Sequence, residues 1–466
     1  MVIYDSVAKE KRRFVPQHGN DVTLYVCGPT VYDDAHLGHA KSALVFDLLS
    51  RVLRANGYHV TYARNITDID DKIIHKAKER HVSIGEITTT YIEAYHHDMA
   101  ALGIARPNLE PRATESIEAM IIMIEQLLAN NHAYAIENGD IYFDTSSDHR
   151  YLTLSGQLQD ADARRQRVES SHLKRHQSDF ALWKAVHDES IAFEAPFGRG
   201  RPGWHLECSA MIEKHLARDG AYAIDIHGGG ADLLFPHHEN EAAQTRCATN
   251  HELAAYWMHN GFVTIEGEKM SKSLGNSFFI KDALKVYQGE VLRFYLLSTH
   301  YRANFNFNET DLLASKKRLD KLYRLKKRLF GLKAIAMVTP FQTQLLDALN
   351  DDLNVSKALA LIDEMIVLSN EKLDINAKDK VAKKEALANI ETIATLLGFG
   401  TNNPFNYFQH GIDTATRQTV EALIAQRNDA KRAKDFATSD ALRDTILALG
   451  ISLMDTPEGT FWERND

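Results

Sequence analysis

Apolar residues near the start of the chain follow first the spacing of a strand and then that of a helix. The apolar run at 22–27 predicts a buried strand, and apolar residues at every third or fourth position predict a helix over 37–56. Residues 59–66 predict a second strand. A strand, a helix and another strand begin a βαβ unit, so we expect an α/β fold with a Rossmann-like, doubly wound parallel sheet. Ligands bind such sheets at the carboxyl ends of the strands.

This pattern is interrupted and later resumes. An inserted module is predicted by helices at 91–102 and 114–130, a strand at 140–143 and a polar stretch at 157–178. The βα pattern returns with a helix at 203–216, a strand at 222–226, a helix from 236 and a strand near 261–266. We therefore expect one sheet that is split by the insertion.

The last third of the chain has a different character. Long helical patterns with few glycines follow Glu309 and predict an all-helical domain to about Leu397. Residues 398–406 are a plausible linker. A small separate module is predicted by helices at 414–434 and 437–449 and a terminal stretch at 451–462.

Length, composition and charge narrow the class of protein. The chain has 466 residues, which is too long for one compact core, and its 44% hydrophobic and 25% charged residues are typical of an ordered soluble protein. Three cysteines are too few for a disulfide framework and favour a reducing, cytoplasmic location. We find neither a signal peptide nor an apolar stretch long enough to span a bilayer. The net charge of -9 argues against indiscriminate nucleic-acid binding, although local basic stripes can still bind phosphates.

Two short motifs could hold a nucleotide phosphate. His36, Gly38 and His39 lie where the first strand gives way to its helix, and helix N-termini bind phosphates. Two ordinary histidines at a helix start are an equally good interpretation of that motif alone. Lys269 and Lys272 lie in a glycine-flanked loop, Lys-Met-Ser-Lys-Ser, that could close over a triphosphate, although a solvated charged loop is the alternative.

A candidate metal site is spread along the chain. Cys27 ends the first strand, Cys208 lies in a later helix, and His237 and Glu241 are four residues apart on one helix face. Two thiolates, an imidazole and a carboxylate are suitable ligands for Zn²⁺. The distance between the cysteines in sequence exceeds that of any local metal motif, so inert buried cysteines remain the alternative, and Cys247 is expected to be a core residue.

In this order, the two phosphate motifs resemble the paired signatures of class I aminoacyl-tRNA synthetases. Together with the metal candidates, the stretch Asn65 to Lys72 and the stretch His227 to Asp232, they closely resemble the cysteinyl-tRNA synthetase family from Tyr25 to Trp462. The resemblance implies that ATP, with Mg²⁺, and L-cysteine form cysteinyl-adenylate. The cysteinyl group would then pass to the terminal adenosine of tRNA(Cys), whose 2′-hydroxyl would attack the adenylate.

The resemblance also implies roles for single residues. His36, His39, Lys269 and Lys272 would be catalytic, and one Zn²⁺ per chain would be held by Cys27, Cys208, His237 and Glu241. ATP would contact His36, Gly38, His39, Gly229, Asp232 and Lys272, and cysteine would contact Thr67, Trp204 and His227. His205 and His238 would lie nearby. Without the resemblance, the glycine triplet 228–230 is a plain tight turn.

The expected division of the chain follows the same resemblance. The segments are the first catalytic half at 1–115, a connective insertion at 116–200, the second catalytic half at 201–260, a stem-contact region at 261–309, a helical tRNA-binding domain at 310–400 and an anticodon-binding module at 407–466. In the last module, Lys431, Arg432, Asp440 and Asp455 would contact tRNA. Basic residues crowd the helix at 316–328, where phosphate binding and a merely solvated face are comparable interpretations.

A zinc ion would explain how cysteine is told from serine. The two amino acids are nearly isosteric, and an apolar pocket separates such pairs by only about a hundredfold. A thiolate is a much better ligand for zinc than a serine hydroxyl. Two alternatives remain open: a ligase that joins cysteine to a sugar amine, which lacks the anticodon module, and a non-enzymatic, zinc-containing RNA-binding protein. We expect a monomer that binds no membrane.

Overall fold

The computed structural model describes residues 1–156, 174–187, 191–265, 268–269, 278–333, 337–456 and 459–465. The chain forms two compact units. The first contains Met1–Lys281, Thr299–Asn308 and Asp347–Val355, and the second contains Asp282–Ser298, Glu309–Leu346 and Ser356–Asp466. None of the described helices is both long enough and apolar enough to cross a bilayer.

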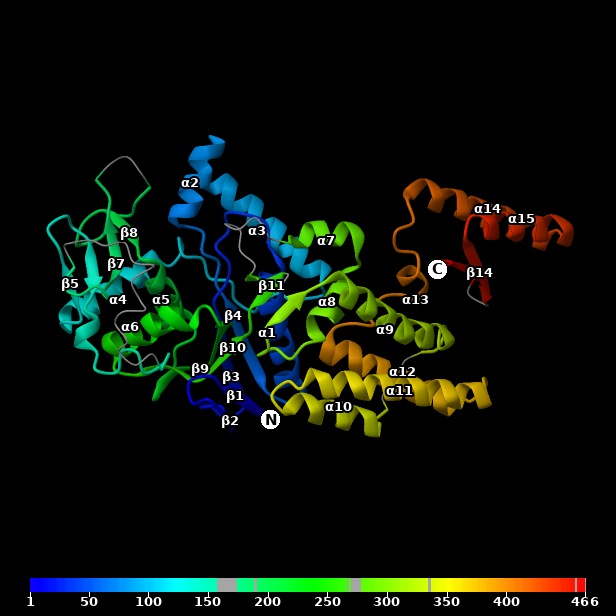
Figure 1. Ribbon diagram of the computed structural model, residues 1–466, viewed down its shortest axis with the longest axis horizontal. Helices are drawn as coiled ribbons and strands as arrows, with labels where there is room; N and C mark the ends of the chain where they lie inside the picture. The colour runs from blue at the N-terminus through cyan, green and yellow to red at the C-terminus, as the bar shows by residue number, and fades with distance from the viewer. Residues whose placement is uncertain are drawn as a thin grey trace. The chain divides into compact units, whose positions relative to one another are not determined.

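A parallel four-stranded sheet lies at the centre of the first unit (Figure 1), in the order β10-β9-β3-β4. The strands are β3 (Asp21–Val26), β4 (His59–Arg64), β9 (Tyr222–Gly230) and β10 (Glu252–Asn260). β3 pairs in parallel with β4 on one side and with β9 on the other. Strands from before and after the insertion are therefore neighbours, which confirms the predicted split α/β sheet.

The helices around this sheet begin where the strands end. α1 (Leu37–Ala55) follows β3, and its residues Leu44, Leu49 and Val52 are fully buried. The remaining helices of this part are α2 (Asp71–Arg80), α3 (Ile84–Ala101), α5 (Trp204–His215) and α6 (Glu239–Thr249). A hairpin of β1 (Val2–Asp5) and β2 (Glu10–Arg13) precedes the sheet. The predicted helix at 91–102 starts earlier, at Ile84, because Ser83 and Glu86 form a capping box there.

The insertion is a small antiparallel sheet with one helix. Its elements are α4 (Ile117–Ala129), β5 (Ala133–Ala135), β6 (Ile141–Phe143), a short helical turn η1 (Thr145–Ser147), β7 (Phe180–Ala185) and β8 (Gly200–Pro202). The predicted helix at 114–130 corresponds to α4, and of the four strands only the one at 140–143 was expected. The three-residue strands β5 and β8 are too short for a pattern to be recognised, whereas the six-residue strand β7 was missed. Most of the predicted polar stretch lies outside the described residues. Cys247 is buried in the apolar cluster beneath this sheet, as predicted.

The sequence analysis did not predict the strand β10. A second small sheet follows this strand in the chain. It is three-stranded, in the order β12-β11-β13, with β11 (Val263–Ile265), β12 (Glu268–Lys269) and β13 (Phe305–Phe307). β11 pairs with β12 in antiparallel fashion and with β13 in parallel. Residues on both sides of α8 in the sequence thus meet in one sheet.

The second unit is almost entirely helical, as predicted. Its helices are α7 (Ile280–Val286), α8 (Gly289–Leu297), α9 (Glu309–Arg328), α10 (Pro340–Asn350), α11 (Val355–Ile375), α12 (Lys380–Leu397), α13 (Pro404–Tyr407), α14 (Thr414–Arg432) and α15 (Phe436–Ala448), although α7, α10 and α11 each have residues in the first unit. The hairpin β14 (Ile451–Thr456) and β15 (Gly459–Arg464) ends the chain. The predicted linker at 398–406 is wrong, because Phe399 and Phe405 are fully buried and Glu290 accepts hydrogen bonds from the backbone of Gly400 and Thr401.

Candidate active site

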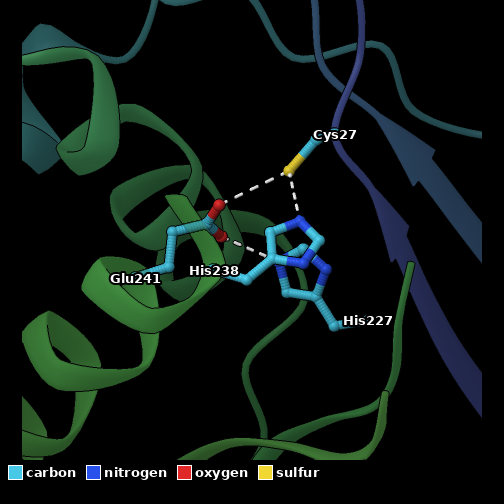
Figure 2. A group of neighbouring side chains, drawn as sticks. All are labelled: Cys27, His227, His238 and Glu241. Atoms are coloured by element: carbon cyan, nitrogen blue, oxygen red, sulfur yellow. Dashed lines mark hydrogen bonds and ion pairs between the residues drawn. The ribbon is translucent and has the colours of Figure 1, made fainter. Parts of the chain in front are cut away.

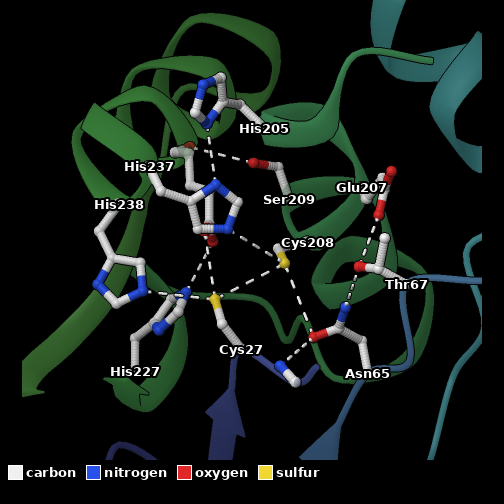
Figure 3. A network of polar contacts seen from close by, with 12 residues as sticks. Cys27, Asn65, Thr67, His205, Glu207, Cys208, Ser209, His227, His237 and His238 are labelled. Carbon is white, nitrogen blue, oxygen red and sulfur yellow. Dashed lines mark hydrogen bonds and ion pairs between the residues drawn. The ribbon is translucent and has the colours of Figure 1, made fainter. Parts of the chain in front are cut away.

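Four side chains that are remote in sequence meet beyond the end of β3. Cys27 follows β3 directly, Cys208 lies in α5, and His237 comes from the turn η2 (Leu234–His238) (Figure 3). Glu241 lies in the first turn of α6. Their ligand atoms all lie within 4.8 Å of one another. These are the four residues predicted to bind zinc, and we call them the zinc tetrad.

The distances within the zinc tetrad suit a tetrahedral zinc ion. Usual zinc–ligand bond lengths require about 3.8 Å between two sulfur atoms and about 3.6 Å between sulfur and nitrogen. The sulfur atoms of Cys27 and Cys208 are 3.7 Å apart, and Cys208 Sγ lies 3.7 Å from His237 Nε2. Cys27 Sγ lies 3.4 Å from Glu241 Oε1. The 2.8 Å between His237 Nε2 and Glu241 Oε1 is shorter than a tetrahedron edge, as an ion pair would be.

The charges of the zinc tetrad also suit a cation. Burial raises the pKa of Cys208, but hydrogen bonds with Cys27 and His237 outweigh it and bring the pKa to about 6. Burial also raises the pKa of Glu241, yet the neighbouring His237 and His227 hold that pKa well below its usual value. Against the effect of burial, Glu241 and Cys208 in turn raise the pKa of His237 to about 10, and burial raises the pKa of Cys27 well above its usual value. A buried thiolate and a buried carboxylate thus face one imidazolium, which leaves an excess of one negative charge. A divalent cation would compensate this charge.

A second set of four potential ligands overlaps the first. Cys27, His227, His238 and Glu241 also have ligand atoms within 4.8 Å (Figure 2). This set contains one thiol instead of two. Within it, His227 Nε2 lies 2.7 Å from Glu241 Oε2, and outside it, His238 Nδ1 lies 2.8 Å from His259 Nε2. The zinc tetrad, with both sulfur ligands, is the better match for a soft cation.

Trp204 and His205 lie against the histidine of the zinc tetrad. The ring of Trp204, which is 41% exposed, stacks on that of His237 at a centroid distance of 4.2 Å. His205 Nδ1 lies 2.9 Å from His237 Nδ1. This bond occupies one ring nitrogen of His237 and leaves Nε2 toward the other ligands, as is usual for metal-binding histidines. Burial lowers the pKa of His205 to about 3, so this partner is neutral.

Thr67 belongs to a buried network on the other side of Cys208 (Figure 3). Its hydroxyl donates to Glu207 Oε2 at 3.0 Å and accepts from Asn65 Nδ2 at 3.3 Å. Asn65 Oδ1 accepts the backbone N–H of Gly28 at 2.7 Å. A Cβ atom on Gly28 would lie 1.6 Å from the carbonyl oxygen of Asn65, so only glycine fits here. The network therefore fixes the segment that follows Cys27.

The histidines of the first phosphate motif cap α1. His36 Nδ1 accepts the N–H of Gly38 at 3.1 Å, and His39 Nδ1 accepts the N–H of His36 at 3.2 Å. The two rings stack with centroids 3.8 Å apart. A backbone N–H can only donate, so each Nδ1 carries no proton, and in the neutral rings the proton lies on Nε2. Both histidines are thus set as Nε2–H donors at a helix N-terminus.

The lysine motif is connected to the first motif by its flanks. Before the loop, Thr264 of β11 pairs with Lys269 of β12. After the loop, the Phe278 carbonyl accepts the N–H of Leu37, and the Ile280 N–H donates to the Ala35 carbonyl. Residues that follow the loop of the lysine motif are therefore hydrogen-bonded to the start of α1. Lys272 and the side chain of Lys269 lie outside the described residues.

The glycine triplet forms the end of β9. A Cβ on Gly228 would meet Phe46 of α1 at 2.2 Å, and one on Gly229 would meet His238 at 2.8 Å, so both glycines permit close packing. Asp232 follows in a turn in which Leu233 N–H donates to the Gly230 carbonyl. The triplet and Asp232 thus lie at the carboxyl edge of the sheet, where α/β folds bind ligands.

Most basic residues of α9 are already paired inside the second unit. Lys316, Arg318, Lys327 and Arg328 form ion pairs of 3.0, 2.7, 2.5 and 2.7 Å. Arg328 is exposed but paired, whereas Lys317, Lys321 and Arg324 are exposed and have no ion pair in the described part of the chain. Their spacing places all three on one helix face, which we call the α9 basic face.

Of the predicted tRNA contacts, Asp455 has the most internal partners. It accepts two hydrogen bonds of 2.9 Å from Arg427 and one of 2.6 Å from Lys431. Arg432 pairs with Asp429, and Asp440 is exposed on α15. The sequence analysis missed Arg427, although its place four residues before Lys431 on one helix face was a signal. It also assigned no role to Asn65, Glu207 and His259, which have hydrogen-bond partners distant in sequence.

Three family models match successive parts of the chain. The model for the class I (C) tRNA synthetase catalytic domain matches residues 13–317, the DALR domain matches 345–401, and the cysteinyl-tRNA ligase anticodon binding domain matches 413–462. Among solved structures, the chain resembles a methionyl-tRNA synthetase from Mycobacterium tuberculosis with a TM-score of 0.59 at 13% identity, over 81% of this chain and 92% of that one. A LeuRS–tRNA complex from Agrobacterium radiobacter gives a TM-score of 0.60 at 12% identity, over 83% and 85%. These likenesses show the fold.

Curated relatives extend over the whole chain. The cysteine–tRNA ligase of Sulfurimonas denitrificans is 66% identical over 465 residues, and that of Helicobacter pylori strain P12 is 54% identical over 467 aligned positions, with 100% of both chains covered in each case. Identity of this extent, together with the matching catalytic and anticodon-binding domains, places the chain in the cysteine–tRNA ligase family of class I aminoacyl-tRNA synthetases.

Proposed function

We propose that this cysteine–tRNA ligase selects its amino acid with a Zn²⁺ held by Cys27, Cys208, His237 and Glu241. The enzyme joins L-cysteine and ATP into cysteinyl-adenylate and passes the cysteinyl group to the terminal adenosine of tRNA(Cys). The observation that supports the zinc is the convergence of four ligand atoms, two of them sulfur, within 4.8 Å. When bound, zinc would supply a Lewis acid that prefers the thiolate of cysteine to the hydroxyl of serine.

The surrounding residues would orient the zinc tetrad and close the amino-acid pocket. His205 orients the ring of His237, and His227 holds the second oxygen of Glu241 at 2.7 Å. The half-exposed Trp204 stacks on His237 and would cover the bound amino acid. Thr67 fixes the segment after Cys27 and would line the same pocket.

Adenylate formation would take place at the two phosphate motifs. His36 and His39 present Nε2–H groups at the start of α1, where they would donate to phosphate oxygens as charge develops on them. Gly38, Gly229 and Asp232 would complete the ATP site with bound Mg²⁺, and Lys269 and Lys272 would hold the departing pyrophosphate. His36 and His39 are caps of α1, so the donors are positioned before ATP binds.

The test measures zinc content together with cysteine-dependent pyrophosphate exchange and charging of total tRNA. We expect about one zinc per chain, and exchange that chelation abolishes and added zinc restores. Exchange with serine should be slower by far more than a hundredfold. Equal exchange with serine, or full activity without metal, would contradict the zinc proposal. Cysteine-dependent exchange without charging of tRNA would favour a sugar-amine ligase, and adenylate formation excludes a non-enzymatic RNA-binding protein.

For tRNA, we propose contacts of the α9 basic face and of Lys431, Arg432, Asp440 and Asp455. Replacing Lys317, Lys321 and Arg324 together by alanine should raise KM for tRNA(Cys) about tenfold and reduce the salt dependence of binding by about two to three counterions. Cysteine-dependent exchange should not change. The matched control replaces the paired Lys316, Arg318 and Arg328, with the same loss of charge. Equal effects in the two triple variants would show that total charge, and not this face, matters. The monomeric state and the cytoplasmic location stay predictions.

A further inference from the structure

One buried carboxylate of the first unit has no role in the reaction as proposed above. Asp352 is fully buried and lies in the connection between α10 and α11. Its backbone has a φ of 57°, and that of Leu353 has a φ of 52°. Residues other than glycine rarely adopt this left-handed conformation, and they keep it where surrounding contacts fix it, often at functional positions.

The carboxylate of Asp352 accepts hydrogen bonds from two separate segments. Oδ1 accepts the backbone N–H of Tyr4 at 2.8 Å and the hydroxyl of Tyr301 at 2.7 Å. Oδ2 accepts from Arg302 Nε at 2.9 Å, and Arg302 Nη2 also lies 2.9 Å away. The backbone adds two bonds: Asp352 N–H donates to the Val2 carbonyl at 3.0 Å, and His300 Nε2 donates to the Asp352 carbonyl at 3.0 Å. We call this group the Asp352 clasp.

The segment that the clasp holds leads directly to the lysine motif. The Gly261 N–H donates to the Tyr301 carbonyl at 2.8 Å, and a Cβ on Gly261 would lie 2.4 Å from the carbonyl oxygen of Ala303. Residues 305–307 are β13, which pairs with β11, and Thr264 of β11 pairs with Lys269 of β12. A displacement of Tyr301 and Arg302 would therefore move the strands that carry Lys269.

The same segment also contacts the helix of the first phosphate motif. Lys41, in the second turn of α1, is buried and donates to the Thr299 carbonyl at 3.1 Å, and its ammonium group lies 5.3 Å from the ring centroid of Phe305. Residues 299–307 thus contact α1, the strand β11, which in turn pairs with β12, and the Asp352 clasp. The position of the lysine motif relative to the histidine motif depends on this segment.

We propose that Asp352 is a positioning residue for adenylate formation, which holds residues 300–302 so that β12 and Lys269 are correctly placed over the ATP site. The proposal rests on the proposed role of the lysine motif. Asp352 touches neither substrate nor metal ligand. Its effect should therefore fall on the rate of adenylate formation and not on the binding of cysteine or zinc.

The experiment compares Asp352→Asn and Tyr301→Phe with the wild type in pyrophosphate exchange. Asparagine keeps the size of the side chain but replaces one acceptor oxygen by a donor, and phenylalanine removes the single hydroxyl that donates at 2.7 Å. Misplacement of reacting groups by a fraction of an ångström reduces rates strongly, so we expect kcat, counted per active site by a burst titration of adenylate, to fall about tenfold in Asp352→Asn and less in Tyr301→Phe. KM for cysteine and zinc content should stay within twofold of the wild type.

The control variant is Asp351→Asn, in which the neighbouring, half-exposed carboxylate that pairs with Lys11 at 2.6 Å is changed. It should keep the wild-type kcat. A purely structural role of Asp352 would lower Tm and the titrated fraction of active sites but leave kcat per active site unchanged, and that result would overturn the proposal. If Asp352→Asn does not fold, Tyr301→Phe decides by the same criterion. Wild-type exchange that depends on cysteine and zinc shows that the proposed function holds, whatever the variants do.

Discussion

Replacing Cys208 by serine should remove most of the bound zinc and lower cysteine-dependent pyrophosphate exchange by at least a hundredfold. Even partners of metal ligands cost ten- to a hundredfold when they are lost, and Cys208 would be a direct ligand. Serine keeps the volume of the buried side chain, but its hydroxyl is a poor zinc ligand that does not ionise near neutral pH. Zinc content by mass spectrometry of metals and exchange rates on the same preparation check this prediction.

Selectivity should fall along with activity in this variant. Without the metal, shape alone is left to separate cysteine from serine, so the ratio of their kcat/KM values should drop to about a hundred or less. Initial rates of exchange with each amino acid at equal concentrations far below KM would measure that ratio.

The matched control for this variant is Cys247→Ser. Cys247 is buried in an apolar cluster and belongs to neither set of potential metal ligands, and burial raises the pKa of its thiol to about 12. This variant should keep zinc, exchange and selectivity, although it loses some stability. If Cys208→Ser retained a full complement of zinc and a wild-type preference for cysteine, the zinc tetrad would not be the site. The second set of ligands, with Cys27, His227, His238 and Glu241, would then become the better candidate.

Periodicity predicted the split sheet and the helical second unit because both depend on local pattern. The helix at 37–56 and the strand at 59–66 match α1 and β4 within two residues. The short strands β5 and β8 of the insertion could not be predicted in the same way, because three residues such as 200–202 contain too little pattern. The supposed linker failed for another reason: its glycine and asparagine residues indicate a loop, but Phe399 and Phe405 are buried by contacts that sequence does not reveal.

The parts of the site that could be predicted are those in which the type of a single residue indicates its function. Nothing in the spacing of Cys27 and Cys208 indicates that their sulfur atoms lie 3.7 Å apart, and the resemblance to a family supplied that pairing. Asp352 and Arg427 were missed because buried carboxylates and guanidinium groups look like surface charges in a sequence. Their importance comes from partners distant in the chain, such as Tyr301. Local signals therefore find ligands and caps, whereas networks require the fold.

Replacing His39 by alanine should lower kcat for cysteine-dependent exchange by about a hundred- to a thousandfold, the usual cost of losing one donor to a developing negative charge. His39 is the third residue of α1, and its Nδ1 accepts the N–H of His36, which leaves the proton on Nε2. The amino-acid pocket lies on other elements, so KM for cysteine and zinc content should not change. A loss seen in kcat alone would place the interaction in the transition state.

Two further substitutions separate capping from proton donation. In His39→Asn the amide oxygen can replace Nδ1 as the acceptor for His36, so the cap should survive, but no donor reaches the position of Nε2. In His39→Gln the longer amide can place an N–H close to the position of Nε2. We therefore expect His39→Asn to unfold at nearly the wild-type Tm yet be as slow as His39→Ala, and His39→Gln to recover part of the rate. If His39→Asn were as fast as the wild type, the ring would serve only to cap α1, and the donor to the phosphate would have to be sought in His36 or in the lysine motif.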